Sequence, residues 1–337
     1  MQGICVAVVG AAGAVGTQVV RLLEERGFPV ADLRLYATKR SAGTRVRFKD
    51  EELVVRELTG PSLDGARLAF LAVGTEASRE LAPALARQGV TVIDKSNAFR
   101  MDPGVPLVVP EVNPEALAGH RGIVASPNCS TIQLVVALNP IRRRAGLRRV
   151  IVSTYQSVSG TGVDAMAELR EQTRQVLDGQ EPTRKVYPHQ IAFNCLPHID
   201  DFDANGYSLE EMKLVRETRR IFGDESLAIS ATAVRVPVFI SHSEAVTVQT
   251  ERPLSAEEAR ALLRQAPGVV VQDDPGRAVY PLPIHAAGRD EVFVGRIRQD
   301  LALENGLSLW VVADNLRKGA ATNAVQIAEH LLREGML

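Results

Sequence analysis

The chain has few cysteines and no arrangement of them that indicates a metal site. Cys5, Cys129 and Cys195 are the only three among 337 residues, and they show neither close pairing nor metal-ligand spacing. This usage argues against a disulfide framework and a structural zinc site, and it favours a reducing compartment.

The chain also lacks a charge excess, a long apolar run and repeats. Its formal net charge of −1 argues against electrostatic binding to nucleic acid or to an anionic membrane. No apolar stretch reaches membrane-spanning length, and residues 1–4 lead into a strand without the basic segment and long apolar core of a signal peptide. We therefore expect a cytoplasmic protein.

What is present is the composition of an ordinary α/β protein, with 45% hydrophobic and 23% charged residues. A length of 337 residues predicts two domains.

The first half begins with a phosphate-binding pattern. Residues 4–9 form an apolar run typical of a central parallel strand, and a turn with Gly10, Gly13 and Gly16 leads into a helical pattern. Strand, glycine turn and helix together indicate the start of a doubly wound, dinucleotide-binding sheet. The glycine spacing is G-x-x-G-x-x-G, so it matches the usual fingerprint only approximately.

The turn after the next strand, residues 33–37, bears on the choice of cofactor. An NAD-binding chain usually has an acidic residue there for the ribose 2′-hydroxyl. Here the chain has Thr38, Lys39, Arg40, Ser41 and Ala42, which suit a 2′-phosphate and favour NADP. The alternative is a solvated basic turn.

Further strands at 67–73 and 90–94, with a helix at 77–88, continue the α/β pattern. Asn97 and Arg100 follow the strand at 90–94, on the side where open sheets bind ligands. Arg100 could clamp a phosphate or a carboxylate, although a surface salt bridge is the more common use of such a residue.

Cys129 lies between a predicted buried strand at 122–125 and a predicted helix at 132–138. A helix N-terminus favours a thiolate, but by only about 0.3–1 kcal/mol, less than one pKa unit. A nucleophilic Cys129 would therefore need a base, such as a histidine distant in sequence. The alternative is a small buried hydrophobic residue, as most free cysteines are.

Other polar residues of the second half stand out from their surroundings. Gln156 ends a predicted strand at 149–155, and Glu210 and Lys213 share one face of a predicted helix at 209–217. Arg235 interrupts an otherwise apolar strand and needs an anion, either a protein carboxylate or a ligand. His242, just after that strand, is the leading candidate for the base, although the sequence alone barely separates it from the other histidines.

The remaining elements are predicted strands at 292–298 and 307–312 and a last helix at 316–332 that returns to the first sheet.

With these pieces assembled, the sequence closely resembles the bacterial aspartate-β-semialdehyde dehydrogenase family. The matching stretches follow one another through nearly the whole chain: 8–16, 40–43, 108–113, 127–131, 153–160, 210–213, 235–237 with 242–244, and 314–321. Two departures are Ala12, where threonine is common, and a short segment at 179–190.

The resemblance implies a fold and an activity. It implies a Rossmann-like NADP-binding domain over 1–127, completed by a C-terminal helix at 314–337. A catalytic and dimerisation domain of the glyceraldehyde-phosphate-dehydrogenase-like type would cover 128–313. The activity would be NADPH-dependent reductive dephosphorylation of L-4-aspartyl phosphate to L-aspartate-4-semialdehyde, for the synthesis of lysine through diaminopimelate and of methionine, threonine and isoleucine. A homodimer is expected, with no metal.

The resemblance also implies a role for individual residues. Cys129 would be the nucleophile that forms an acyl-thioester, His242 the acid/base and Gln156 the residue that orients the reacting groups. Arg235 would bind the substrate α-carboxylate and Glu210 its amino group. The phosphate would be held by Arg100 and Lys213. The expected cofactor contacts are Gly10, Gly13, Ala14, Val15, Gly16, Thr38, Arg40, Ser41, Ala42, Ser159, Gly160 and Asn315.

Three rival functions are weaker. A reductase of the N-acetylglutamyl-phosphate type would not need the groups around Arg235 and Glu210 that suit a free amino acid. An acyl-thioester reductase of the malonyl-CoA type would not need Arg100 and Lys213 for a phosphate. A regulatory NADP-binding protein without chemistry would not need Cys129.

Overall fold

The computed structural model describes residues 3–337 and divides the chain into two compact units. The first contains residues up to Asn128 and from Ala320 onward, and the second runs from Cys129 to Gly319. We expected the chain to return to the first domain at residue 314. In the structure the returning segment begins at Ala320.

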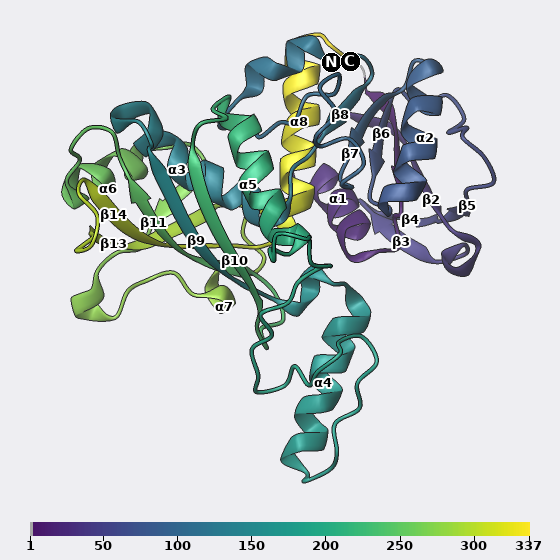
Figure 1. The fold of residues 1–337 in the computed structure, drawn as a ribbon. Coiled ribbons are helices and arrows are strands. Elements are labelled where there is room, and N and C mark those ends of the chain that lie inside the picture. The colour runs from purple at the N-terminus through teal and green to yellow at the C-terminus, as the bar shows by residue number, and fades with distance from the viewer. Residues whose placement is uncertain (1–2) are drawn as a thin grey trace. The chain divides into compact units, whose positions relative to one another are not determined.

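The first unit contains a six-stranded parallel sheet in the order β5-β2-β1-β6-β7-β8 (Figure 1). β1 is central and fully apolar, which suits a strand with both faces buried. The elements of this unit are β1 Ile4–Val9, α1 Ala14–Glu25, β2 Val30–Ala37, β3 Arg45–Phe48, β4 Glu51–Val54, β5 Arg56–Glu57, β6 Leu68–Leu71, α2 Thr75–Arg87, β7 Thr91–Asp94, β8 Ile123–Ala125 and α8 Thr322–Arg333, with 3₁₀ turns η1 Lys39–Ser41 and η2 Pro114–Gly119.

The last helix packs in the core of the first unit. Val325 and Leu331 of α8 belong to the same core as Val6, Val8 and Leu22 of β1 and α1. The helix does not run from 316 as one regular element, because a π-helical turn, η5 Arg317–Ala321, precedes α8.

The second unit contains a mixed six-stranded sheet in the order β10-β9-β11-β14-β13-β12. β9 is parallel to β10 and antiparallel to β11. Its elements are α3 Cys129–Ala145, β9 Arg149–Gln156, α4 Val163–Leu177, α5 Leu209–Phe222, β10 Ala228–Arg235, β11 His242–Gln249, α6 Ala256–Gln265, β12 Val269–Val271, α7 Pro283–Ala286, β13 Val292–Gln299 and β14 Gly306–Ala313, with 3₁₀ turns η3 Val158–Gly160 and η4 Pro275–Arg277.

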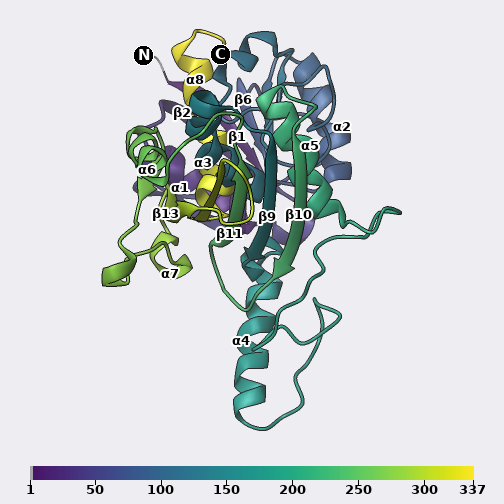
Figure 2. The same ribbon diagram turned by 60° about the vertical axis from the view of Figure 1, so that its left-hand side comes forward.

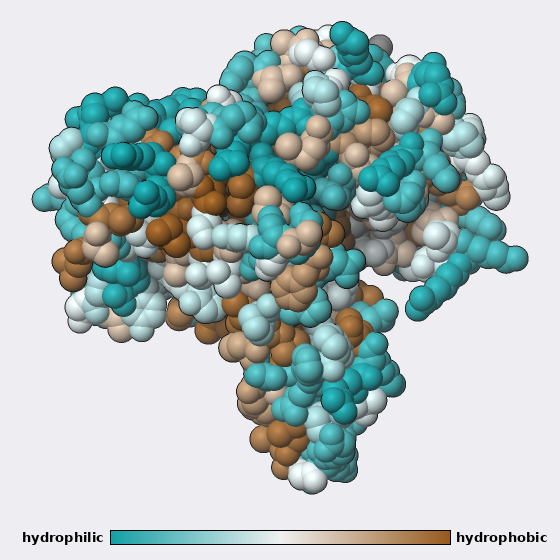
Figure 3. All heavy atoms as spheres, in the orientation of Figure 1, coloured by the Kyte–Doolittle hydropathy of each residue, from teal (hydrophilic) through white to brown (hydrophobic). Residues whose placement is uncertain are grey.

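The two faces of this mixed sheet differ. Helices α3, α5 and α6 pack against one face, as Figure 2 shows. Along β9, Val150 and Val152 face these helices and are buried, whereas Ile151 and Tyr155 on the opposite face are about two-fifths exposed. In Figure 3 apolar side chains gather over β9 and β11 on this open face.

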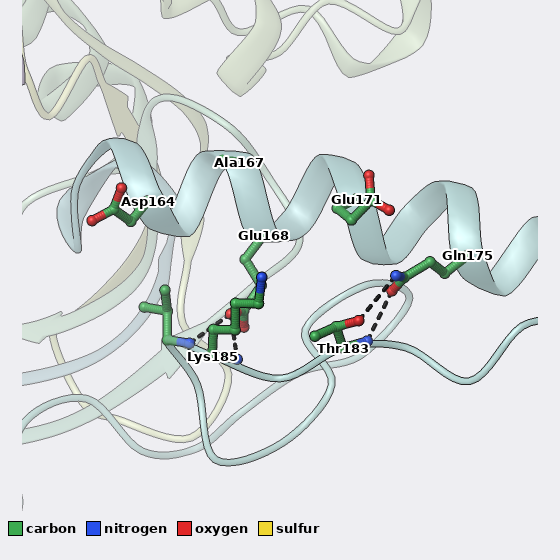
Figure 4. Close-up of a pocket in the computed structure, with 8 residues that line it drawn as sticks. Asp164, Ala167, Glu168, Glu171, Gln175, Thr183 and Lys185 are labelled. Atoms are coloured by element: carbon green, nitrogen blue, oxygen red, sulfur yellow. Dashed lines mark hydrogen bonds between the residues drawn. The ribbon is translucent and has the colours of Figure 1, made fainter.

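Within the second unit, α4 extends away from the sheet and carries the following loop with it (Figure 1). A hollow of about 580 Å³ is lined by residues of α4 and of the segment 183–186. Figure 4 shows the side chains that line it. Buried Glu168 accepts hydrogen bonds from the backbone N–H groups of Lys185, Val186 and Tyr187 at 2.5–3.2 Å. The carboxylate therefore holds the loop against the helix, and its hydrogen-bonding needs are met within the protein.

Candidate active site

Cys129 is the first residue of α3, the helix that follows the short strand β8 in sequence. Its side chain is partly exposed, so it is not one of the fully buried hydrophobic cysteines. The helix dipole favours the thiolate form at this position. Cys129 therefore has the solvent access and the favourable helix dipole that a thiolate nucleophile requires.

Gln133, one turn further along α3, connects this helix to β11. Its buried side-chain amide lies 3.5 Å from the backbone carbonyl oxygen of His242, the first residue of β11. Four residues span about 6 Å along a helix axis. The beginning of the helix that carries Cys129 therefore lies against the beginning of the strand that carries His242.

The imidazole of His242 is completely buried and held on one side. The backbone N–H of Ser157 donates to its Nδ1 at 3.0 Å, and the Ser157 hydroxyl lies 3.1 Å from the same nitrogen. Burial lowers the pKa of His242 well below its ordinary value, and the nearby Arg235 cation lowers it further. His189, His198 and His285, by contrast, are exposed.

Arg235, the last residue of β10, is a buried cation. Its Nη1 donates to the backbone carbonyl oxygen of Ser157 at 2.8 Å, but its buried Nε has no partner among residues 3–337. A Cβ placed on Gly160 would lie 2.9 Å from Arg235 Nη1 and 3.3 Å from His242 Nε2. The two side chains therefore both lie against the backbone of Gly160.

Gln156, Glu210 and Lys213 form a hydrogen-bonded row. Gln156 Nε2 donates to Glu210 Oε1 at 3.1 Å, and Lys213 Nζ donates to Glu210 Oε2 at 3.2 Å and to Asp200 Oδ2 at 2.7 Å. Burial lowers the pKa of Lys213, but Glu210 and Asp200 outweigh it, so that the pKa is raised overall. A capping box between Ser208 and Glu211 begins α5 and so positions Glu210 and Lys213.

Asn315 connects the loops around His242. Its Oδ1 accepts hydrogen bonds from the hydroxyls of Ser157 and Ser159 and from the backbone N–H of Ser241, at 2.9–3.1 Å. Ser241 has a left-handed backbone, with φ of 79°, directly before His242. The amide oxygen of Asn315 is thus used within the protein.

The glycine turn of the first unit fits a dinucleotide phosphate. Gly10 has φ of 85°, and a Cβ there would collide with the Ala72 carbonyl oxygen, as one on Gly16 would with the Gly10 carbonyl oxygen. Gly13 precedes α1, which begins at Ala14, and no side chain caps this helix. Its first N–H groups, including that of Val15, are therefore suited to an anion.

The turn after β2 also has the expected basic character. Thr38, Lys39 and Arg40 are exposed, whereas Ser41 and Ala42 are partly exposed. Neither basic side chain forms an ion pair with another residue of the described chain.

Arg100 is buried in the first unit, where Nε and Nη2 donate to the backbone carbonyl oxygens of Ser126 and Lys95 at 3.0 and 2.7 Å. Its expected contact with phosphate stays a prediction.

Sequence reasoning missed two residues of this cluster. Asp200 binds Lys213 from an irregular loop, and no periodic pattern marks that position. Ser157 belongs to the matching stretch at 153–160, but its contact with His242 depends on the backbone N–H, which every residue except proline carries.

Within residues 3–337, no group of acidic, cysteine or histidine side chains is arranged to hold a metal ion. No described helix combines the length and the apolar character needed to cross a membrane.

Comparisons with known proteins identify the family. Residues 5–120 match the family described as "Semialdehyde dehydrogenase, NAD binding domain", and residues 138–318 match "Semialdehyde dehydrogenase, dimerisation domain". An aspartate-semialdehyde dehydrogenase from Aquifex aeolicus (strain VF5) is 56% identical over 340 residues, 100% of both sequences.

Solved structures agree. Aspartate semialdehyde dehydrogenase II from Vibrio cholerae, complexed with ASA, superposes with a TM-score of 0.96 at 47% identity, over 99% of each chain. The enzyme from Candida albicans with NADP has a TM-score of 0.77 at 26% identity, over 100% of each chain. The chain therefore belongs to the aspartate-semialdehyde dehydrogenase family.

Proposed function

We propose that this protein catalyses the reductive dephosphorylation of L-4-aspartyl phosphate to L-aspartate-4-semialdehyde, on the route to lysine, methionine, threonine and isoleucine. The observation that carries the proposal is Arg235: a buried guanidinium, with no partner for its Nε in the described chain, that lies with His242 against the backbone of Gly160. Burying such a cation without an anion is costly, which supports a carboxylate ligand there.

The chain's own residues supply the acyl-transfer chemistry. Cys129 attacks the acyl carbon and forms a thioester as phosphate leaves. Gln156 orients the reacting groups, and His242 serves as the acid/base. Arg235 binds the α-carboxylate of the substrate and Glu210 its amino group. Lys213 and Arg100 bind the phosphate.

The cofactor we propose is NADP, which in its reduced form, NADPH, would supply the hydride when bound. The turn from Gly10 to Gly16 would hold its phosphates, and Thr38, Arg40, Ser41 and Ala42 the 2′-phosphate. Support comes from the uncapped N-terminus of α1 and from the exposed basic side chains of the turn. Ser159, Gly160 and Asn315 are further proposed contacts.

We also propose a homodimer that acts in the cytoplasm. The match to a dimerisation domain and the open face of the mixed sheet, where Tyr155 and Trp310 lie with ring centroids 5.4 Å apart, support the dimer. Three free cysteines suit a reducing compartment.

An assay in the reverse direction tests the proposal. Phosphate-dependent reduction of NADP is followed by nicotinamide absorbance with aspartate semialdehyde, with N-acetylglutamate semialdehyde, and with NAD replacing NADP. We expect turnover with aspartate semialdehyde and NADP, little with the acetylated substrate, and none for Cys129→Ser. Preference for the acetylated substrate, or turnover by the variant, would contradict the assignment.

A further inference from the structure

Glu244 is a buried carboxyl group that the proposed mechanism does not use. It lies on β11, it is inaccessible to solvent, and neither of its carboxyl oxygens has a hydrogen-bond partner at ordinary geometry among residues 3–337. A carboxylate buried without a counter-charge and without hydrogen bonds is costly. Buried polar groups in folded proteins are almost always satisfied, so a partner has to be identified for this one.

The side chain of Gln133 on α3 is the partner at hand. It is also fully buried, it interacts with the Glu244 carboxyl, and its own Oε1 has no hydrogen-bond partner in the described chain. Its Nε2 lies 3.5 Å from the backbone carbonyl oxygen of His242, two residues before Glu244. Unsatisfied oxygen atoms of the two side chains therefore lie beside each other.

Gln133 and Glu244 lie one layer further into the second unit than the two groups that carry the proposed chemistry. Gln133 follows Cys129 by four residues, so both lie on one face of α3, about 6 Å apart along its axis. Glu244 follows His242 by two residues, so both lie on one face of β11, about 6.6 Å apart. Because the two spacings are nearly equal, a bond between Gln133 and Glu244 aligns the start of the helix with the start of the strand.

The neighbours of Glu244 within the sheet are uncharged. Its register partners are Thr154 on β9 and Val311 on β14, and both are buried. Burial raises the pKa of Glu244 well above its ordinary value, and the Gln133 side chain only partly offsets this increase. The surroundings therefore favour a neutral carboxylic acid.

The titratable groups on the elements around this layer leave that result unchanged. They are His242 on the same strand, Cys129 at the start of α3 and Lys318, which is buried in η5. None of these three contributes to the shift in the pKa of Glu244, and Tyr155 on β9 lies on the opposite, open face of the sheet. An ionised Glu244 would moreover disfavour a thiolate at Cys129, because like charges repel.

We propose that Glu244 is a protonated carboxylic acid paired with the side-chain amide of Gln133, and that this pair positions Cys129 relative to His242. The acid O–H donates to Gln133 Oε1, and the acid carbonyl oxygen accepts from Gln133 Nε2. The second proton of Nε2 remains for the backbone carbonyl oxygen of His242. Each unsatisfied oxygen of the two side chains is then used. The catalytic part of this inference rests on the proposed function.

Infrared spectroscopy of the full-length protein tests the protonation state without any turnover. A protonated carboxyl group absorbs at a higher frequency than the amide backbone and than ionised carboxylates, and ¹³C-labelled glutamate shifts the band of a glutamic acid. At about pH 7, above the ordinary pKa of 4.5, we expect such a band in the wild type and its loss in Glu244→Gln. A wild-type spectrum without this band, or the same band in the variant, would overturn the proposal.

Substitutions test whether the pair positions the reacting groups. Glu244→Leu and Gln133→Leu each remove one half of the pair. Both are expected to lower kcat by about 10- to 100-fold, with a smaller change in KM, because the reacting groups are displaced and not removed. Glu244→Gln keeps a side chain that both donates and accepts, so it should retain most of the wild-type kcat. Wild-type kcat in either leucine variant would exclude a positioning role.

An exchange of the two side chains gives the sharpest result. The double variant Gln133→Glu with Glu244→Gln rebuilds the acid–amide pair in the opposite direction and should have a clearly larger kcat than Gln133→Glu alone. A double variant no more active than Gln133→Glu would contradict the pair.

Val246→Ala, at the next buried position on the same face of β11, is the matched control. It should lower thermal stability and leave kcat unchanged. Because the infrared result needs no substrate, failure of this inference is distinguishable from failure of the proposed function, in which the wild type itself would not turn over aspartate semialdehyde.

Discussion

At residue 160, the absence of a side chain allows the backbone to pack closely against Arg235 and His242. A Cβ there would approach Arg235 Nη1 at 2.9 Å and two atoms of the His242 ring at 3.3 Å. We therefore expect Gly160→Ala to lower kcat/KM for aspartate semialdehyde by about 10- to 100-fold, because misplacement of a reacting group by about 1 Å has effects of this size. The measurement is steady-state kinetics with a thermal melt of each protein.

Gly60→Ala is the matched control, since nothing lies within 4 Å of a Cβ at that position and its backbone φ is not in the left-handed region. It should leave kcat/KM unchanged. Wild-type kinetics for Gly160→Ala would show that the close contact of residue 160 with Arg235 and His242 does not matter for the reaction.

Single residues with unusual surroundings were the most predictable part of the site. Arg235 stands out within an apolar strand, and the structure does bury it. Asp200 and Ser157 could not be found in this way, because their contacts arise from the three-dimensional course of two loops. Among the histidines, the sequence favours His242 only weakly as the base, because the contacts that distinguish it arise from the fold.

Among the elements, strands and helices with clear periodicity were predicted well. The predicted strand at 149–155 corresponds to β9 Arg149–Gln156, and the predicted helix at 209–217 extends to Phe222. Residues 316–332 read as one helix in the sequence, yet residues 317–321 form a π-helical turn. A Cβ on Gly319 would lie 3.0 Å from Cys129 Cβ, and such packing constraints are not visible in helical periodicity.

The loop after α4 depends on one carboxylate. Glu168→Ala removes the acceptor of three backbone N–H groups and should destabilise the loop locally by roughly 1–3 kcal/mol. Amide hydrogen exchange at Lys185, Val186 and Tyr187 should then accelerate by about 10- to 100-fold.

Glu171→Ala, at an exposed position of the same helix, is the control and should leave exchange unchanged. Amide exchange in Glu168→Ala that is as slow as in the wild type would show that other contacts hold the loop.

For the whole molecule, the buried Glu244 links stability to pH. Neither of its carboxyl oxygens has a hydrogen-bond partner at ordinary geometry in the described chain, although Gln133 lies near enough to offset slightly the increase in pKa caused by burial. A carboxyl whose pKa is raised in the folded state makes its full contribution to the stability of the fold at pH values below the pKa that it has in the unfolded chain. That contribution is lost as pH rises toward the folded value.

Glu244→Gln keeps the shape and removes this titration. Its free energy of unfolding relative to the wild type should therefore increase as pH rises above the ordinary value of 4.5. Urea unfolding at about pH 5 and about pH 8 measures the difference between the two proteins. A difference that does not change with pH would mean that Glu244 is not the group responsible.

Cys129 is the proposed nucleophile that carries the acyl group, and every other role in the site depends on it. The most direct test mixes the protein with aspartate semialdehyde and NADP without phosphate, so that the thioester cannot be released to phosphate, followed by acid quenching and peptide mass analysis. We predict a stoichiometric burst of NADPH and an aspartyl adduct on the peptide that contains Cys129. A burst without this adduct, or an adduct on another residue, would contradict the account.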